Sequence, residues 1–534
     1  MEANHTIPTA TFPLAQGRKS RSKTKSKETV RKIAFYLTVA LVFIRTSQIH
    51  ELITYRLNFN SYLLFVVGIP AILGLFISKS ASKPFRFPQA YLWMAFSLWI
   101  VVTVPFSIWK AGSLQIVEDY WRTNVILFVL LGGLTTTWEE FKLLLRVLAI
   151  SCVVNLVIIK VFGQLDINDR MTLPFGALAN SNDYAAHLLM LLPCLLWVAL
   201  VAKSIKFRIV VLGIFGYGLF AALSSASRGA LVAVSAGIVY FLFSASNKQR
   251  IWAAGLAALM LFAVFSVMSH DAVQRMLSFS KKSSSASDEA LESSDIRQHL
   301  LEDAIHSALN HPVFGLGPGN FATFEGKTKP GMWEPAHNSY ATVASETGFP
   351  GFFLLVGGIA ATFSTFRRIK LRFRGDERAK DLLQAAICMQ LMMVMFCLAV
   401  GFLNFTLSFH FPLMVGISIA MAYATENWQR STNPWQQAKR VAQEKEKTNS
   451  KKRRKRGEPK VSATGMHLWR NNSRGSSSRK SGSSLFGSSR GGKFRAVDPT
   501  RADAQERPFD QQKGDHGDEQ RDRQAERIDD PKTR

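Results

Sequence analysis

The sequence has little cysteine and little acidic charge, and each shortage excludes a class of protein. Four of the 534 residues are cysteine, and each lies singly within an apolar stretch. A disulfide framework or a zinc site is therefore not expected. Asp and Glu total 38, against 65 Lys and Arg. No acidic residue lies deep in an apolar run, where an ion-coupled carrier usually needs one, so the carrier class is disfavoured.

Long apolar runs fill the sequence between residues 33 and 425. Each run is about 17 to 23 residues long, which is enough to cross a hydrocarbon core about 30 Å thick. About twelve such runs predict an all-α polytopic membrane protein, and residues 1–30 contain no segment typical of a cleavable signal peptide. The predicted spans are 33–48, 61–78, 90–108, 121–135, 143–163, 184–202, 207–223, 229–246, 251–268, 348–366, 382–402 and 406–424.

The charges of the loops predict the orientation of the chain. Alternate loops are rich in Lys and Arg and should be cytoplasmic. The loop at about 270–347, between the ninth and tenth spans, has six Lys and Arg against ten Asp and Glu, which favours the outer face. We expect a basic cytoplasmic tail at 1–32, a membrane domain at 33–425 with this one large, mainly helical loop, and a second basic cytoplasmic tail at 426–534.

The formal net charge of +27 does not indicate a nucleic-acid-binding protein. Two-thirds of this charge lies in the two predicted tails beside the membrane. The basic run at 451–456 could bind RNA or act as a targeting signal, but attraction to anionic lipid head groups is the simpler interpretation. The Ser- and Gly-rich remainder of the C-terminal tail lacks periodicity and is predicted to be disordered.

Arg228 lies at a short break between two long apolar runs, in the segment LSSASRGALVAV. An arginine at a membrane boundary often extends its charge into the head groups without any further role. A guanidinium held by tight Ser and Gly turns is also a fixed, permanently charged fork that suits phosphate oxygens. Arg228 is therefore a candidate anion-binding residue.

An amphipathic helix is predicted in the outer loop, from Asp295 as its N-cap to just before Pro312. The apolar residues that recur at helical spacing and form its predicted buried face are Ile296, Leu300, Leu301, Ala304, Ile305 and Ala308. Arg297 would lie in its first turn, where the helix dipole disfavours a basic residue. Such an arginine is either a solvated surface residue or the partner of an anion. The segment FGLGPGNF that follows has the wrong spacing and context for a dinucleotide site, and its glycines predict tight turns instead.

The segment EPAHNSYATVASETGFPG, at 334–351, places His337 and Asn338 before a short polar helix. We expect that helix to start at Pro335, with His337 in its first turn and Gly348 just after its end. A histidine near a helix N-terminus tends to stay neutral and can accept a proton. A purely structural histidine is the alternative, and Asn338 could fix the helix start or contact a sugar.

The spacing of this segment resembles a family signature. His337-Asn338, nine residues, Gly348, two residues and Gly351 are similar to the His-[Asn/Ser/Gln]-x9-Gly-x2-Gly pattern of the O-antigen ligase and polymerase superfamily. ANSNDYAAH at 179–187 resembles the family's Asn-rich start of a mid-chain helix. SSASRGA resembles its outer-face arginine, and SDIR with HPVFGLGPGNF resembles the arginine helix and Gly-rich turn of its large periplasmic loop.

The resemblance implies a GT-C-like, all-α glycosyltransferase of the bacterial inner membrane, with its active site on the periplasmic face. Such proteins transfer a glycan from undecaprenyl pyrophosphate to another glycan, to lipid A core or to a protein. It implies that Arg228 and Arg297 bind the leaving pyrophosphate in place of a metal, and that His337 orients or deprotonates the acceptor hydroxyl, with inversion at the sugar. No cofactor is implied. The further substrate-binding residues that it implies are Arg170, Asn182 and Asn338.

Several alternatives stay open at this level. Ligases, polymerases and protein O-oligosaccharyltransferases share these motifs, and one sequence does not separate their acceptors. A polysaccharide or lipid transporter is a different class with a similar number of spans, but the two halves of this chain show no matching interrupted helices. A membrane scaffold with a basic tail would leave the outer arginines and His337 unexplained.

Overall fold

The computed structural model describes residues 16–432 except 167–169, 226, 245, 248–249, 252–253, 256–265, 267–284 and 330–332, and of 16–25 and 285–294 it describes the backbone only. The chain divides into two compact units, Met1–Asn449 and Ser450–Arg534. Every described residue belongs to the first unit. Most of the predicted span 251–268 and nearly all of the predicted C-terminal tail lie outside the described residues.

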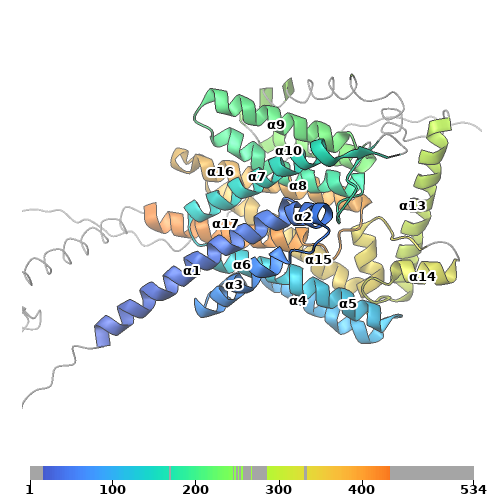
Figure 1. Cartoon of the computed structure of the whole chain (residues 1–534), viewed down its shortest axis with the longest axis horizontal. Helices are drawn as coiled ribbons and strands as arrows, with labels where there is room; N and C mark the ends of the chain where they lie inside the picture. Colours follow the sequence, from blue (N-terminus) through green and yellow to red (C-terminus); the bar gives the residue numbers. More distant parts are fainter. Residues whose placement is uncertain are drawn as a thin grey trace, which may run out of the picture. The chain divides into compact units, whose positions relative to one another are not determined.

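Helices make up most of the first unit (Figure 1). They are α1 (Gln16–Thr46), α2 (Ile49–Leu57), α3 (Leu63–Ile77), α4 (Pro88–Thr103), α5 (Lys110–Tyr120), α6 (Ile126–Leu134), α7 (Trp138–Phe162), α8 (Ser181–Val201), α9 (Ile205–Leu223), α10 (Arg228–Ser244), α13 (Ser285–Asn310), α14 (Phe321–Thr328), α15 (Ser339–Arg372), α16 (Lys380–Ala399) and α17 (His410–Thr432). Short 3₁₀ or π segments lie at Lys83–Arg86, Val104–Phe106, Trp121–Val125, Glu377–Ala379 and Val400–Phe402. Strands β1 (Gln164–Leu165) and β2 (Met171–Thr172) pair antiparallel, with Gln164 opposite Thr172 and Leu165 opposite Met171.

The helices confirm an all-α polytopic membrane protein. Among the described residues, six helices are long and apolar enough to cross a membrane, or seven if the bent pair Ser26–Thr46 and Ile49–Leu57 forms one span. Two shorter apolar helices, α3 and α10, coincide with further predicted spans. The count of twelve spans and the outer position of the 270–347 loop stay predictions.

Helix α8 lies at the centre of the bundle. It packs against α7, α9, α10 and α16, and 83% of its apolar window is buried, against 33% for α9. The sequence explains this position, because α8 is apolar on all sides beyond its first turn and a helix of that kind is buried. The polar residues at the start of α8 are therefore held at the centre of one end of the bundle.

Small residues allow the helices to approach closely. A Cβ added to Gly74 of α3 would lie 2.5 Å from the Ala34 Cβ of α1. A Cβ added to Gly416 of α17 would lie 2.9 Å from the Leu131 Cβ of α6. Close packing at glycine and alanine is typical of helices in membranes, where lipid is as apolar as the side chains it touches.

Helix α13 crosses one end of the bundle and packs against α15 (Figure 1). We call this end of the bundle the α13 end. The predicted apolar face of α13 is confirmed in part, because Leu300, Ala304 and Ala308 are buried whereas Ile305 is exposed. The predicted start was wrong: the helix begins at Ser285, ten residues before Asp295, so Asp295 is not its N-cap.

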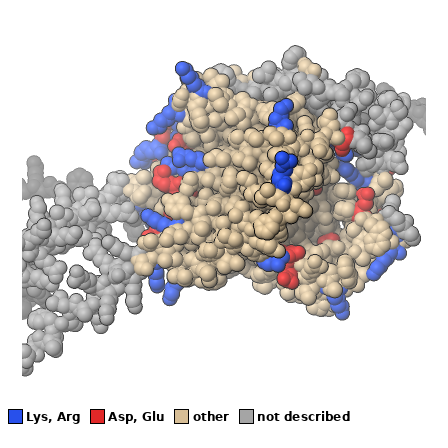
Figure 2. Space-filling model, in the orientation of Figure 1, with Lys and Arg blue, Asp and Glu red and all other residues tan. Residues whose placement is uncertain are grey.

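Charged side chains gather away from the middle of the visible face of the bundle. Figure 2 shows many Lys and Arg at the left, then a broad surface that is mostly neither acidic nor basic, and a mixture of both signs towards the α13 end. A band without charge between two charged ends suits a chain that crosses a hydrocarbon layer.

Candidate functional site

The start of α15 differs from the expected one and fixes the backbone of His337. Asn338 is the N-cap, and its side-chain oxygen accepts hydrogen bonds from the backbone N–H groups of Tyr340 and Ala341, both at 3.0 Å. The prediction that His337 lies in the first helical turn was wrong, because the helix begins at Ser339. His337 instead has a φ of 47°, in the left-handed region that few residues other than glycine adopt.

Gly348 interrupts α15 and divides it into two parts. The sequence predicted that the short helix would end at this glycine. Its φ is 70° and its ψ is 179°, so α15 consists of a short helix before it and a long one after it. A Cβ at this position would lie 2.1 Å from the carbonyl oxygen of Val313. A side chain is therefore excluded twice, by the backbone conformation and by the approach of the loop after α13.

The Gly-rich turn after α13 packs against the short first part of α15. Gly315, Gly317 and Gly319 have φ values of 67°, 96° and 74°, which confirms the predicted tight turns. The N–H of Leu316 donates to the carbonyl of Ser345 at 2.8 Å. The N–H of Gly317 donates to the carbonyl of Glu346 at 2.9 Å. These bonds hold the loop that carries α13 against the segment that carries His337.

Glu346 strengthens this junction, and no pattern in the sequence predicts this role. Its side chain is buried and accepts hydrogen bonds from the N–H of Gly319 at 2.8 Å and from the N–H of Phe321 at 3.3 Å. Two backbone donors satisfy a carboxyl group that would otherwise be costly to bury. Glu346 is therefore a structural residue that positions the site.

Arg297 belongs to α13, the helix that packs against the segment that contains His337. Ala336, next to His337, packs in one apolar cluster with Leu300 and Ala304 of α13. Arg297 is half-buried and lies well inside α13, so the argument from the first turn of a helix does not apply to it. Its positive charge acts on the imidazole of His337 and on the carboxyl group of Asp183 at the start of α8.

His337 is held as a neutral base. Burial lowers the pKa of its imidazole, and the charge of Arg297 lowers this pKa further, whereas Glu334 raises it. The Glu334 carboxylate lies 3.5 Å from Nε2 of the ring. The lowered pKa agrees with the expected neutral ring, and its causes are burial and a neighbouring cation rather than a helix N-terminus.

Arg228 is the first residue of α10, after a turn that separates it from α9. Its side chain is half-buried. The next residue, Gly229, packs against Phe402, where an added Cβ would lie 2.9 Å from the ring. Phe402 leads into the 403–409 loop. Arg228 therefore starts its helix beside that loop, at the α13 end.

The 403–409 loop is bound to the start of α15. The hydroxyl of Ser339 donates to the carbonyl of Leu403 at 2.7 Å and accepts from the N–H of Phe405 at 2.8 Å. The Tyr340 hydroxyl donates to the carbonyl of Cys397 at 2.7 Å, at the end of α16. The segments that carry Arg228 and His337 thus share one loop as their common neighbour.

The two remaining predicted residues already have local partners. Arg170 forms an ion pair with Asp166 across the β1–β2 hairpin, with its Nε 2.8 Å from Oδ2. Asn182 is buried in the first turn of α8, and its N–H donates to the Asn180 side chain at 2.8 Å. Their contact with a substrate stays a prediction.

Three further polar residues at this end were not predicted as site residues. Asp183 faces Arg297 in the first turn of α8. His187, one turn later, bonds to His410 with a nitrogen–nitrogen distance of 2.9 Å. Asp183 and His187 both lie in the segment ANSNDYAAH, whose polar residues at the edge of an apolar run were a usable signal. His410 lies inside a predicted span, and its pairing depends on packing between distant helices.

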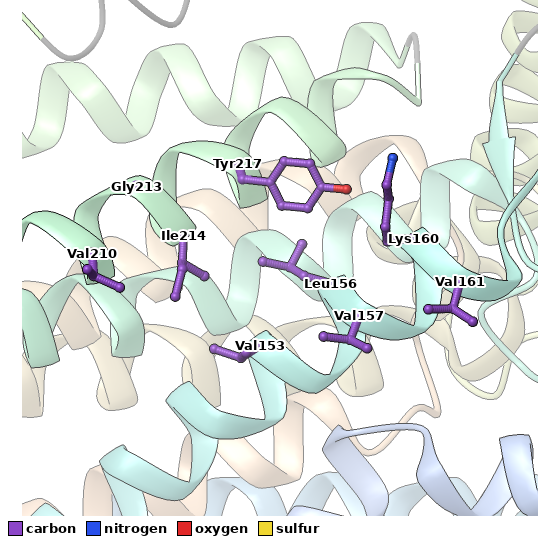
Figure 3. Close-up of a pocket in the computed structure, with 9 residues that line it drawn as sticks. All are labelled: Val153, Leu156, Val157, Lys160, Val161, Val210, Gly213, Ile214 and Tyr217. Carbon is purple, nitrogen blue, oxygen red and sulfur yellow. The ribbon is translucent and has the colours of Figure 1, made fainter.

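An apolar groove lies between α7 and α9 (Figure 3). Its volume is about 470 Å³, and Lys160 and Tyr217 are its polar or charged lining residues. The full lining is Val153, Leu156, Val157, Lys160, Val161, Val210, Gly213, Ile214 and Tyr217. None of the predicted site residues lines this groove. In the described part of the chain, no group of three or more His, Cys, Asp or Glu side chains could hold a metal ion.

Part of the chain matches a known protein family. Residues 213–356 match the family model described as O-antigen ligase. No curated protein matches the chain. The matched segment contains Arg228, Arg297, His337 and Gly348, which the fold brings to the α13 end of the bundle. The match therefore bears out the resemblance seen in the sequence and supports membership of this chain in the O-antigen ligase and polymerase superfamily.

Proposed function

We propose that this protein is a membrane glycosyltransferase that moves a glycan from undecaprenyl pyrophosphate to an acceptor hydroxyl on the outer face of the bacterial inner membrane. The observation that carries the proposal is the placement of a neutral histidine beside one arginine, at the end of the bundle where a second arginine starts its helix. This arrangement lies inside the segment that matches the family.

The reaction requires one bond to form as another breaks. The acceptor oxygen attacks the anomeric carbon of the sugar, and the bond from that carbon to the pyrophosphate oxygen breaks with its electron pair. Positive charge develops on the sugar, and negative charge develops on the leaving undecaprenyl pyrophosphate. Arg228 and Arg297 would bind this leaving group as two planar forks. Attack opposite the leaving group inverts the anomeric carbon.

His337 would receive the proton of the acceptor hydroxyl. A neutral imidazole has a lone pair available for this step, and the lowered pKa keeps the ring neutral at pH 7. As the proton arrives, Glu334 at 3.5 Å would stabilise the imidazolium. The two arginines would supply the positive charge that a metal supplies in other glycosyltransferases, so we expect transfer to persist in EDTA.

The proposal is tested by transfer from a purified lipid-linked donor to an acceptor, with EDTA present. Arg228→Lys and Arg297→Lys keep the charge but lose the fork, so each is expected to lower turnover about tenfold to a hundredfold. His337→Ala should lower it about 10²- to 10⁴-fold, the usual contribution of a general base. Arg122→Lys is the control, because Arg122 is exposed and paired with Asp119.

Each result has a clear consequence. Near-wild-type turnover in any of the three site variants removes that residue from the mechanism, and loss of activity in EDTA removes the replacement of a metal by arginines. The acceptor defines the alternatives within the superfamily, namely a ligase acting on lipid A core, an exopolysaccharide polymerase and a protein O-oligosaccharyltransferase. Mass spectrometry of the lipid-linked glycans that accumulate in a deletion strain would separate them.

A further inference from the structure

Helix α1 carries two arginines with very different surroundings. Arg31 is buried and fully partnered: it bonds to the carboxylates of Glu28 and Glu140 and to the carbonyl of Leu134. Arg45 lies in the last turn, half-buried, and its Nε is buried without any hydrogen-bond partner among the described residues. Its guanidinium carbon lies 4.8 Å from the centre of the Phe409 ring. Arg31 therefore has partners for its buried guanidinium, whereas the buried Nε of Arg45 on the same helix has none among the described residues.

The nearby carboxylate does not complete Arg45. Glu51 accepts a hydrogen bond from the N–H of Ala177 at 2.9 Å, and its other oxygen lies 3.7 Å from Nε2 of His50. The charge of Glu51 acts on Arg45, but no ion pair within 4 Å joins the two side chains. A buried guanidinium nitrogen without an acceptor is costly, so this arrangement points to a missing partner for Nε.

The histidines next to Arg45 also use their nitrogens elsewhere. His187 Nε2 lies 2.9 Å from the carbonyl of Thr46, which can only accept, so this nitrogen carries the hydrogen. His187 Nδ1 then accepts from Nε2 of His410 at 2.9 Å. Nδ1 of His410 lies 3.1 Å from the Ser408 hydroxyl, which itself donates to the carbonyl of Phe405 at 2.8 Å. The ring nitrogens of both histidines thus lie against partners other than Arg45 and offer it no negative charge.

Arg297 and Arg45 act on two acidic or imidazole side chains that lie one turn apart at the start of α8. Asp183 and His187 are four residues apart, so they share a face and are separated by about 6 Å along the helix axis. The charge of Arg297 acts on Asp183, and the charge of Arg45 acts on His187. The two cations thus act on successive turns at the start of α8.

Arg45 is also connected to the other proposed catalytic residues through the 403–409 loop. Phe409, on which its guanidinium stacks, ends this loop. The first residue of the loop, Leu403, accepts the hydrogen bond from Ser339 at the start of α15. Arg45 lies outside the segment that matches the family, which begins at residue 213.

We propose that Arg45 is a further anion-binding residue of the donor site and contacts the pyrophosphate from the membrane side, below Arg228 and Arg297. The inference rests on the proposed function for the identity of the anion. A lipid-linked pyrophosphate is tethered by a chain that stays in the hydrocarbon layer, so its phosphates enter the site from that side. The pyrophosphate would be the missing anionic partner of Arg45, whose planar guanidinium can donate two parallel hydrogen bonds to phosphate oxygens.

Binding of a short-chain analogue tests the proposal without requiring transfer. Farnesyl pyrophosphate, farnesol and phosphatidylglycerol are titrated against the purified full chain in detergent. Arg45→Gln is expected to weaken farnesyl pyrophosphate binding about tenfold to a hundredfold, the loss of one charge-assisted contact, and to leave farnesol binding unchanged. Arg45→Lys should show an intermediate loss.

The matched control is Arg56 of α2, which is exposed and also stacks on a phenylalanine, with its guanidinium carbon 5.5 Å from the ring of Phe162. Arg56→Gln should bind farnesyl pyrophosphate within about twofold of the wild type. The unfolding temperature of each variant without ligand shows whether it is folded. If Arg45→Gln does not fold, Arg45→Lys decides the question, because it keeps the charge.

The possible outcomes separate this inference from the proposed function. Wild-type affinity of folded Arg45→Gln or Arg45→Lys for farnesyl pyrophosphate overturns the role of Arg45, even if the wild-type protein transfers glycan. An equal loss of phosphatidylglycerol and farnesyl pyrophosphate binding overturns the assignment to the donor, because it indicates a general lipid-phosphate contact. A wild-type protein that binds farnesyl pyrophosphate through Arg45 but transfers no glycan supports the binding role and overturns the proposed function.

Discussion

His337 combines an unusual backbone with an imidazole that resists protonation. Its left-handed φ of 47° costs free energy that the surrounding contacts must offset. Asn338 caps the helix on one side, and Ala336 is buried against α13 on the other. Histidine is among the residues that tolerate this conformation better than branched side chains do. A strained residue held by rigid neighbours is typical of a site that needs one ring orientation.

The charges next to His337 predict how activity depends on pH. The active ring is neutral, so turnover should fall as pH drops through the folded pKa, which lies below the ordinary value of about 6.5. Glu334 raises this pKa, so Glu334→Gln should lower it and move the acid limb of the kcat/KM profile to lower pH. The pH profile of transfer measures this shift.

Substitution of Arg297 should shift the acid limb in the opposite direction to substitution of Glu334. Its charge lowers the pKa of His337, so Arg297→Gln should raise it and move the acid limb to higher pH, in addition to reducing turnover. Arg297→Lys keeps the charge and should leave the limb near its wild-type position. If the acid limb has the wild-type position in both Glu334→Gln and Arg297→Gln, the protonation of His337 does not control the rate of transfer.

At the scale of elements, the junction between the Gly-rich turn and the first part of α15 holds the site together. Gly348→Ala tests it, because alanine disfavours a φ of 70° and its Cβ would lie 2.1 Å from the Val313 carbonyl oxygen. We expect a loss of about 1–3 kcal/mol in the free energy of unfolding. Thermal and denaturant unfolding in detergent measure the change.

Gly357 provides a control in the same helix. It lies in the regular part of α15, and the atoms nearest to an added Cβ are methyl groups of Leu92 at 3.8 Å. Gly357→Ala should therefore be neutral, or stabilise the helix by up to about 1 kcal/mol through its higher helix propensity. Equal effects of the two substitutions would mean that the break at Gly348 is not essential to the fold.

The sequence predicted features that local chemistry controls and missed features that depend on packing. Glycine spacing predicted the turns at 315–319, and the spacing of Leu300 and Ala304 predicted the buried face of α13. The start of α13 was wrong because polar residues before Asp295 continue the helix. Arg45 lies in the first predicted span, 33–48, where the sequence shows only a charge within an apolar run. Its missing hydrogen-bond partner becomes apparent only when Phe409 and His187 lie against the end of α1.

At the scale of the whole molecule, the described helices place the candidate site at one end of a membrane-spanning bundle. Helix α8 has 21 residues, which corresponds to a length of about 30 Å and to the thickness of a hydrocarbon core. Asp183 begins this helix near Arg297, and Lys203 follows its opposite end. These two positions should lie on opposite sides of the membrane. A donor that is presented outside then requires Asp183 to be at the outer end.

Cysteine labelling with a reagent that does not cross membranes tests this orientation. Glu302 of α13 and Lys203 are both exposed, whereas three of the four native cysteines are buried and Cys397 is partly buried. In intact spheroplasts, Glu302→Cys should be labelled and Lys203→Cys should not be, because basic loops stay in the cytoplasm. Permeabilisation should make both reactive, and the unsubstituted chain controls for native cysteines. Labelling of Lys203→Cys alone in intact spheroplasts would place Arg228, Arg297 and His337 in the cytoplasm, away from a donor on the outer face, and the proposed reaction would fail.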